Sequence, residues 1–326
     1  MKENGIYICI IEIPNGKEVK IVCKPLKYKG NEAFFLDTDE RGNWVSYGKG
    51  IKDFATINDN GLLEEIKQQF QELSGYQMLS CQSQKIALAH NQSYQSIYRP
   101  IYTEHNSNWF VPFKDGKPTK EVYRDMPITN LQEYSNRLRQ LEIVLNDLDN
   151  VFKVITPDRY NKKVYGHAIR DIIILSCTEI DMMMKDILKK NGLSKVRYTT
   201  GDYIKLLPAL KLNDYQVGFY RYGMNSYSPF WRWIPKCPSQ SIWWYNAYNN
   251  VKHDRELYFK QANLGNAINC VMAFVIILIA QYGYRNELWN ESVGRIIRVD
   301  KEPQWDLKDF YFVDSNMCSP IHYPFP

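Results

Sequence analysis

The feature that most constrains the fold is a strongly apolar stretch near the C-terminal end of the chain. Residues 270–280 contain no charged side chain, and the helix predicted over 263–284 is apolar nearly all round through its middle. Other elements must cover such a helix on every side. The run is shorter than the roughly 20 apolar residues that a membrane span requires. We therefore expect a buried helix at the centre of a bundle, and no membrane partner.

Other segments predict the helices that surround this one. In residues 131–155 apolar side chains recur at alternating spacings of three and four, with Thr129 or Asn130 as the cap and Pro157 as the stop. Three more helices and one loop are predicted by periodicity and composition: a helix over 165–190, a short helix over 200–210, an aromatic and proline-rich loop over 219–238, and a helix over 241–255. Together these segments predict a helical bundle.

The first part of the chain has a different pattern. Short alternating runs separated by turns predict strands at 6–13, 19–26 and 33–37, and residues 61–74 predict a helix. Residues 75–126 read as irregular and partly strand, with a turn at 114–118. The fold class is therefore α+β, divided into a β-rich domain of unknown role over 1–125, the bundle over 126–285 and a C-terminal extension over 286–326. Within the extension, 296–299 and 310–313 are candidate strands.

Composition limits the function only loosely. Lysine and arginine exceed the acidic residues by 41 to 36, and a net charge of +5 permits a polyanionic partner such as RNA without requiring one. The seven cysteines are odd in number and never closely spaced, which predicts reduced thiols in a cytoplasmic protein. The sequence contains no phosphate-binding loop, and its five histidines show no metal-ligand spacing. We therefore expect neither a cofactor nor a metal.

The helix predicted over 241–255 carries the candidate site. At about 100° per residue, its two sides differ in character. The core-like side holds Trp244, Ala247, Val251 and Tyr258, and the opposite side holds Asn246, Asn249, Asn250 and His253. A single histidine is more often a satisfied polar residue than a ligand. The asparagines one turn before His253 favour a functional site instead.

The order of three segments resembles the HEPN superfamily of all-helical bundles. These segments are an acidic and polar helix face over 170–185, the run Tyr-Asn-Asn-Val-Lys-His-Asp-Arg over 248–255, and the apolar helix over 263–280. The resemblance covers about the second half of the chain. It implies an Arg-x4-6-His motif, often Arg-Asn-x-x-x-His, at a dimer cleft. Asn249 and His253 match that motif, whereas Tyr248 stands in the arginine position.

The chemistry implied by the resemblance is metal-independent attack of a ribose 2′-OH on the adjacent phosphate. The imidazole moves the proton, and a cation stabilises the crowded phosphorane. Tyr248 cannot supply that fixed charge. Lys252 lies about 100° from His253 and has a long stem that could reach a phosphate. Arg255 helps only if the helix ends at Asp254, and Arg170 or a partner chain could contribute across the cleft.

Two hypotheses from different classes follow. The first is an RNA-directed HEPN-like protein, a metal-independent endoribonuclease of the toxin or phage-defence type that acts as a homodimer. His253 would be the general acid or base and Asn249 would orient it. The residues expected to bind RNA are Lys252, Arg255, Asn246, Asn250 and Arg170. The alternative is a non-catalytic module that binds a nucleotide or a protein partner on the same helical face, with aromatic anchors from residues 219–244.

Overall fold

The computed structural model describes the helical part of the chain almost continuously and the rest in short segments. The described residues are 7–12, 18–28, 31–35, 49–51, 93–102, 113–114, 117–118, 123–124, 128, 130–223, 225–305, 311–312 and 320–325. They belong to two compact units. The first comprises residues 1–92, 99–124 and 305–319, and the second comprises 93–98, 125–304 and 320–326.

The described segments of the first unit are strands. Four of them form an antiparallel sheet in the order β1-β2-β3-β4, with β1 at Tyr7–Glu12, β2 at Glu18–Tyr28, β3 at Asn31–Phe35 and β4 at Lys49–Ile51. A second sheet has the order β12-β5-β8, and a two-stranded pair joins β6 to β7. Their bounds are Tyr311–Phe312 (β12), Ile101–Tyr102 (β5), Tyr123–Arg124 (β8), Phe113–Lys114 (β6) and Lys117–Pro118 (β7). Strands β1, β2 and β3 overlap the segments predicted at 6–13, 19–26 and 33–37, whereas the helix predicted over 61–74 lies outside the described residues.

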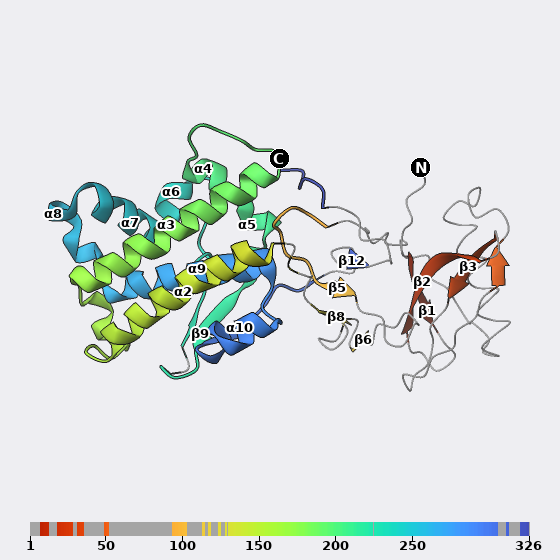
Figure 1. Ribbon diagram of the computed structural model, residues 1–326, viewed down its shortest axis with the longest axis horizontal. Helices are drawn as coiled ribbons and strands as arrows, with labels where there is room; N and C mark the ends of the chain where they lie inside the picture. Colours follow the sequence, from red (N-terminus) through yellow and green to blue (C-terminus); the bar gives the residue numbers. More distant parts are fainter. Residues whose placement is uncertain are drawn as a thin grey trace. The chain divides into compact units, whose positions relative to one another are not determined.

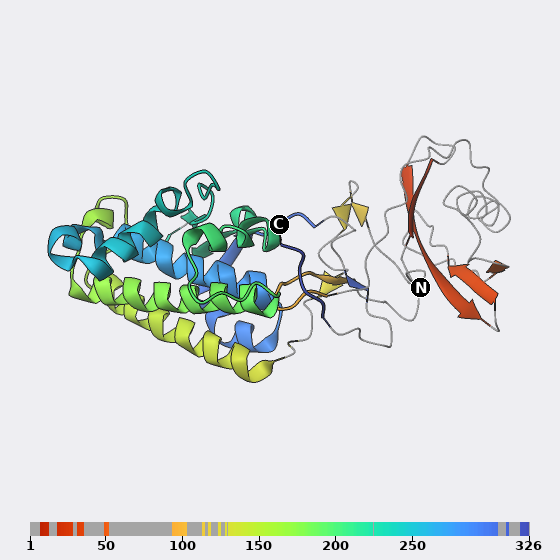
Figure 2. The same ribbon diagram turned by 90° about the horizontal axis from the view of Figure 1, so that it is seen from above.

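The second unit is organised around α9 (Leu264–Tyr282), which packs against α2 (Leu131–Phe152), α3 (His167–Lys190) and α7 (Trp243–His253). Figures 1 and 2 show α9 enclosed by these helices. Every residue of 270–280 is at most 1% exposed. The predicted position of this helix at the centre of a bundle is confirmed.

Contacts at the helix ends fix the directions of the three long helices. The backbone N–H of Leu264 donates to the carbonyl of Val164, and that of Gly166 donates to Ala262, so α3 and α9 begin side by side. At the other end, Lys190 and Tyr282 both donate to Glu133, at the start of α2. Helices α3 and α9 are therefore parallel to each other and antiparallel to α2.

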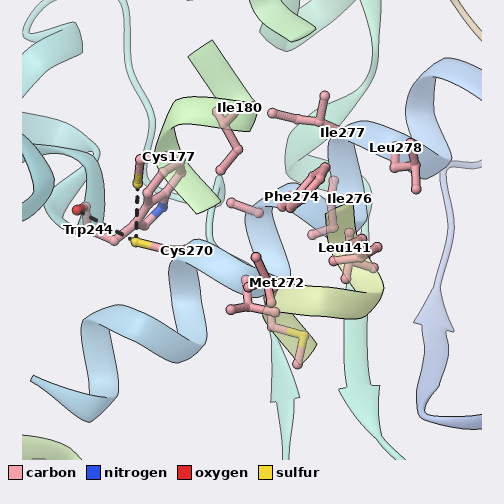
Figure 3. Close-up of a cluster of buried hydrophobic side chains, with 14 of the residues drawn as sticks. Leu141, Cys177, Ile180, Trp244, Cys270, Met272, Phe274, Ile276, Ile277 and Leu278 are labelled. Carbon is pink, nitrogen blue, oxygen red and sulfur yellow. Dashed lines mark hydrogen bonds between the residues drawn. The ribbon is translucent and has the colours of Figure 1, made fainter. Parts of the chain in front are cut away.

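Close packing joins α3 to α9 at their middle. The thiols of Cys177 and Cys270 lie 3.4 Å apart, both are fully buried and both are free cysteines. Figure 3 shows them facing each other beside Trp244 of α7. Burial raises the pKa of Cys177 well above its usual value, which keeps this thiol protonated. Three helices therefore meet around a small, neutral contact.

Short elements connect the long helices. Between α3 and α7 the chain forms α4 (Thr200–Tyr203), α5 (Leu206–Ala209), β9 (Gln216–Phe219), β10 (Ser226–Tyr227) and α6 (Pro238–Ser241), and after α9 it forms α10 (Glu287–Glu291) and β11 (Ile297–Lys301). Strand β9 lies between β10 and β11 in an antiparallel sheet and contacts α9. A Cβ at Gly218 would lie 2.7 Å from the carbonyl oxygen of Asn225, so only glycine fits where these strands meet.

A charged network closes the end of the bundle where α2 starts. The carboxylate of Glu133 accepts from Lys190 and Arg137, and both cations also pair with Asp186. Burial opposes ionisation of Glu133, but the hydrogen bonds from Lys190, Arg137 and Tyr282 outweigh it and lower its pKa to about 2. The two anions and two cations neutralise each other, which makes it tolerable to bury part of their surface.

Helix α9 is long and apolar enough to cross a membrane by length and composition alone, with a mean hydropathy of 2.0 over the most apolar window. The uninterrupted apolar run over 270–280 is shorter than this helix. However, 83% of that window is buried inside the helical unit, as in the core helix of a soluble protein.

Most predicted helix ends agree with the structure. Asn130 caps α2, since its side chain accepts from the backbone N–H of Glu133, and Asn263 caps α9 in the same way. The short helix predicted over 200–210 is two separate turns, α4 and α5. The segment 219–238, predicted to be a loop, contains β10. Residues 286–304, which we assigned to a C-terminal extension, lie in the helical unit, because β11 pairs with β9.

The central position of α9 predicts how the helical unit responds to a cavity. Leu278 is fully buried, so Leu278→Ala is expected to lower the free energy of unfolding by about 2–5 kcal/mol. Leu257 is 69% exposed, and the same substitution there is expected to change it by less than about 0.5 kcal/mol. Urea unfolding followed by tryptophan fluorescence measures both. Equal effects at the two positions would contradict the burial of α9.

Candidate functional site

Helix α7 turns one face into the bundle. Trp244, Ala247 and Val251 are at most 3% exposed, which confirms the predicted core-like side. The indole N–H of Trp244 donates to the carbonyl of Pro229 at 2.9 Å, so its polar atom is satisfied inside the core. Tyr258 does not belong to this face, because it lies in a separate short helix, α8 (Arg255–Tyr258).

The chain leaves the helical conformation at Asp254. Its φ of −141° and ψ of 79° end α7 at His253, and its carboxylate accepts from the backbone N–H of Leu257 to cap α8. The condition that we set for Arg255 is therefore met, since α7 no longer dictates its direction. Lys252 and His253 occupy the last turn of α7, where positive charge suits the helix dipole.

Behind the end of α7 lies a polar cluster that joins α7 to α3, which we call the Asp181 cluster: Asp181, Tyr245, Tyr248 and Lys252. The hydroxyl of Tyr245 donates to the carboxylate of Asp181. The ammonium of Lys252 donates to the hydroxyl of Tyr248 at 2.8 Å and lies 5.0 Å from the centroid of its ring. Tyr248 is only 1% exposed, so the exposed side chain of Lys252 is anchored by a hydrogen bond to a buried hydroxyl.

The pKa values in the cluster follow from burial and from these bonds. Burial raises the pKa of Asp181, although the hydrogen bond from Tyr245 and the charges of Lys185 and Lys252 oppose the shift. Burial and the nearby Asp181 raise the pKa of Tyr245, which therefore stays protonated. The hydrogen bond to Tyr248 raises the pKa of Lys252, which keeps its positive charge.

The exposed part of the predicted site is less organised. Within the described residues, the side chain of His253 makes no hydrogen bond or ion pair, and neither does that of Arg255, and both are exposed. Asn249 and Asn246 are half-buried. No hydrogen bond joins Asn249 to His253 in this part of the chain. The structure thus places Asn249 and His253 on one helix without showing the orienting contact that we expected.

Two other predicted residues have different partners. Asn250 donates to the side-chain oxygen of Gln261 at 3.0 Å, which links α7 to the segment before α9. Arg170 pairs with the neighbouring Asp171 at 3.1 Å. Among the described interactions it has no contact with His253. Within one chain, Arg170 therefore does not take the place of the motif arginine whose position holds Tyr248.

Sequence reasoning missed the Asp181 cluster. We assigned residues 170–185, which include Asp181, to an acidic and polar helix face, and treated Tyr248 only as a departure from a motif. The available signal was the spacing of Tyr245, Tyr248 and Lys252, which brings all three to one side of a helix. The described residues contain no group of three metal-ligating side chains, so the cluster is one of tyrosines, a carboxylate and an ammonium.

The raised pKa of Asp181 predicts a pH dependence of stability. A carboxyl whose pKa is raised in the folded state stabilises the fold most at pH values below its unfolded-state pKa of about 3.8. That stabilisation is lost as the pH rises through the folded-state pKa, because the buried group then becomes charged. Asp181→Asn removes this cost and keeps an acceptor for Tyr245. The variant is therefore expected to gain stability relative to the wild type between pH 4 and pH 7, measured by urea unfolding.

Asp171→Asn is the matched control, because its carboxylate is 66% exposed on the same helix. Its effect is expected to be small at both pH values. A loss of stability by Asp181→Asn, relative to the wild type, between pH 4 and pH 7 would show that the carboxylate is a net stabilising charge and would contradict the burial argument.

No family model, curated protein or solved structure matches this chain. Its function must therefore be argued from the residues of the site.

Proposed function

We propose that the helical unit binds RNA at the end of α7 and cleaves it as a HEPN-like, metal-independent endoribonuclease of the toxin or phage-defence type, in the cytoplasm. The observation that carries the proposal is the contact between Lys252 and Tyr248. It provides a fixed, charged ammonium one residue before the exposed imidazole of His253.

Lys252 supplies what the tyrosine in the arginine position lacks. A cation that is held in place before the reaction stabilises developing phosphate charge without first having to be ordered. The hydroxyl of Tyr248 holds the ammonium, and the bond raises the pKa of Lys252. Tyr248 thus acts as a positioning residue, and Lys252 takes the role of the cation.

His253 supplies the proton transfer. Its imidazole accepts the proton of the ribose 2′-OH as the oxygen attacks phosphorus, and a protonated imidazole donates to the departing 5′-oxygen. The products are a 2′,3′-cyclic phosphate and a free 5′-hydroxyl. Asn246 and Asn250 on α7 and Arg255 at the start of α8 would contact the RNA backbone. In a homodimer, Arg170 of a second copy would add a further cation.

A specific observation favours a second candidate, a non-catalytic module that binds a nucleotide or a protein partner. Catalytic histidines are usually oriented by another group, and His253 has no such partner within the described residues. The same surface would then bind phosphate or a partner protein without cleavage. Binding and cleavage must therefore be measured separately.

Binding is tested with Lys252→Ala/Arg255→Ala and a single-stranded RNA. Each lost phosphate contact is expected to reduce the slope of log affinity against log salt by about 0.7, so the double variant loses about 1.4. Arg139→Ala/Lys153→Ala removes the same charge from side chains that are 68% and 67% exposed, one on α2 and one at its C-cap. An unchanged slope in the first variant, or equal losses in both, would exclude this surface as the RNA site.

Cleavage is tested with His253→Ala in the presence of a chelator. Loss of a general acid–base group is expected to slow cleavage by about 10²- to 10⁴-fold while RNA binding persists. His322→Ala removes another exposed imidazole and serves as the control. RNA that stays intact with the wild-type protein, together with salt-dependent binding, would replace the ribonuclease by the non-catalytic module.

A further inference from the structure

A pocket of about 450 Å³ lies beside the C-terminal half of α3. Cations dominate the charged side chains of its lining, which are Arg137, Lys185, Lys189, Lys195 and the single carboxylate of Asp186. None of these residues belongs to the proposed RNA site at the end of α7. The pocket is therefore a concentration of positive charge that the proposed function has not yet used.

The one carboxylate of the pocket is already neutralised. Asp186 pairs with Arg137 at 3.0 Å and with Lys190 at 2.7 Å. In contrast, the side chains of Lys185 and Lys189 make no hydrogen bond or ion pair within the described residues, and both are exposed. These two lysines are therefore the cations of the pocket that an anionic ligand can contact without first breaking an ion pair.

The loop after α3 brings a third lysine to the pocket. The hydroxyl of Tyr198 donates to the carbonyl of Leu193 at 2.9 Å and accepts from the backbone N–H of Lys195 at 3.1 Å. These bonds close the loop and fix the point from which the side chain of Lys195 leaves the backbone. Its ammonium pairs with Asp202, and 51% of the side chain is exposed. Lys195 thus borders the pocket from a loop of defined shape.

Lys185 connects the pocket to the proposed RNA site. It follows Asp181 by four residues on α3, so the two lie one turn apart on the same side of the helix. The charges of Lys185 and Lys252 both act on Asp181, which is half-buried and accepts from Tyr245. Lys189 lies one turn beyond Lys185, about 6 Å further along the helix axis. Cations therefore follow one another along α3, from Lys252 at the end of α7 to the pocket.

We propose that an RNA strand bound at the end of α7 continues along α3, with neighbouring phosphates at Lys185 and Lys189 and a further phosphate at Lys195 in the pocket. We call Lys252 and these three lysines the α3 track. The inference rests on the proposed RNA site and gives it a substrate class, single-stranded RNA longer than a few nucleotides.

The spacing of the lysines supports this ligand. One helical turn separates Lys185 from Lys189, and this interval is close to the distance between neighbouring phosphates in an extended strand. Lysine contacts to phosphates position a strand but do not read its bases. The α3 track is therefore expected to select RNA by length and not by sequence.

The affinity for RNA of two lengths tests the α3 track on the full-length protein. The probes are labelled 2′-O-methyl single strands, which lack the attacking hydroxyl and stay intact: one of about 12 nucleotides, within the usual range of single-strand sites, and a trinucleotide. For the long strand, Lys185→Gln/Lys189→Gln is expected to reduce the slope of log affinity against log salt by about 1.4, because two phosphate contacts are lost. For the trinucleotide, which the end of α7 accommodates, the slope is expected to stay unchanged. Fluorescence anisotropy measures both.

Two further variants serve as controls. Lys185→Arg/Lys189→Arg keeps both charges and is expected to keep the wild-type slope. Arg139→Ala/Lys153→Ala removes two exposed cations outside the α3 track and is expected to leave both slopes unchanged. An unchanged slope for the long strand in Lys185→Gln/Lys189→Gln would overturn the inference. Equal losses for the two strand lengths, or an equal loss in Arg139→Ala/Lys153→Ala, would also overturn it.

The same measurements separate this inference from the proposed function. If Lys252→Ala/Arg255→Ala reduces the slope and Lys185→Gln/Lys189→Gln does not, the RNA site at the end of α7 stands and the α3 track is wrong. If the wild-type protein binds neither strand at low salt, both are wrong. Because Lys185 and Lys189 are exposed, Lys185→Gln/Lys189→Gln is expected to keep the wild-type melting temperature, so a loss of binding is not a loss of fold.

Discussion

The need to enclose α9 on every side determines the architecture of the helical unit. A fully buried apolar side chain contributes about 1.5–3 kcal/mol relative to an exposed one, and α9 carries such side chains around its whole circumference. One neighbouring helix could cover only part of that surface. Helices α2, α3 and α7 and the strand β9 cover it together, although these four elements are spread over residues 131–253, all before α9 in the sequence.

The parallel alignment of α3 and α9 follows from this requirement and separates two polar regions. Parallel neighbours need a long connection, which here comprises the elements from α4 to α8. The small side chains of Cys177 and Cys270 allow the two helices to approach closely at their middle. The two polar regions described above therefore lie around α9 and not within its apolar middle. Glu133 and its cations lie at one end, and the Asp181 cluster lies between α3 and α7.

The long helices could be predicted because their signals are local and strong. The periodicity of 131–155, the cap at Asn130 and the apolar run of 270–280 each act within a few residues. The pairing of β9 with β11 could not be predicted in this way, because the partners lie about 80 residues apart and both strands are short. The end of α7 at Asp254 could be named only as a condition, because it depends on one backbone conformation and on a cap formed by the side chain of Asp254.

The candidate site shows the same division between local and distant information. Its exposed residues could be named from the polar face of one helix, but the bond from Tyr245 of α7 to Asp181 of α3 could not, because these residues lie far apart in the sequence. Compared with the arginine motif, Tyr248 indicated only the loss of a positive charge. In the fold it is buried, and a buried arginine there would have to place its charge beside Asp181 in the core. A tyrosine keeps a neutral hydroxyl inside and holds the charge of Lys252 at the surface, where an anionic ligand can reach it. In the proposed ribonuclease, Lys252 therefore supplies the cation one helical turn nearer to His253 than the arginine of the motif would.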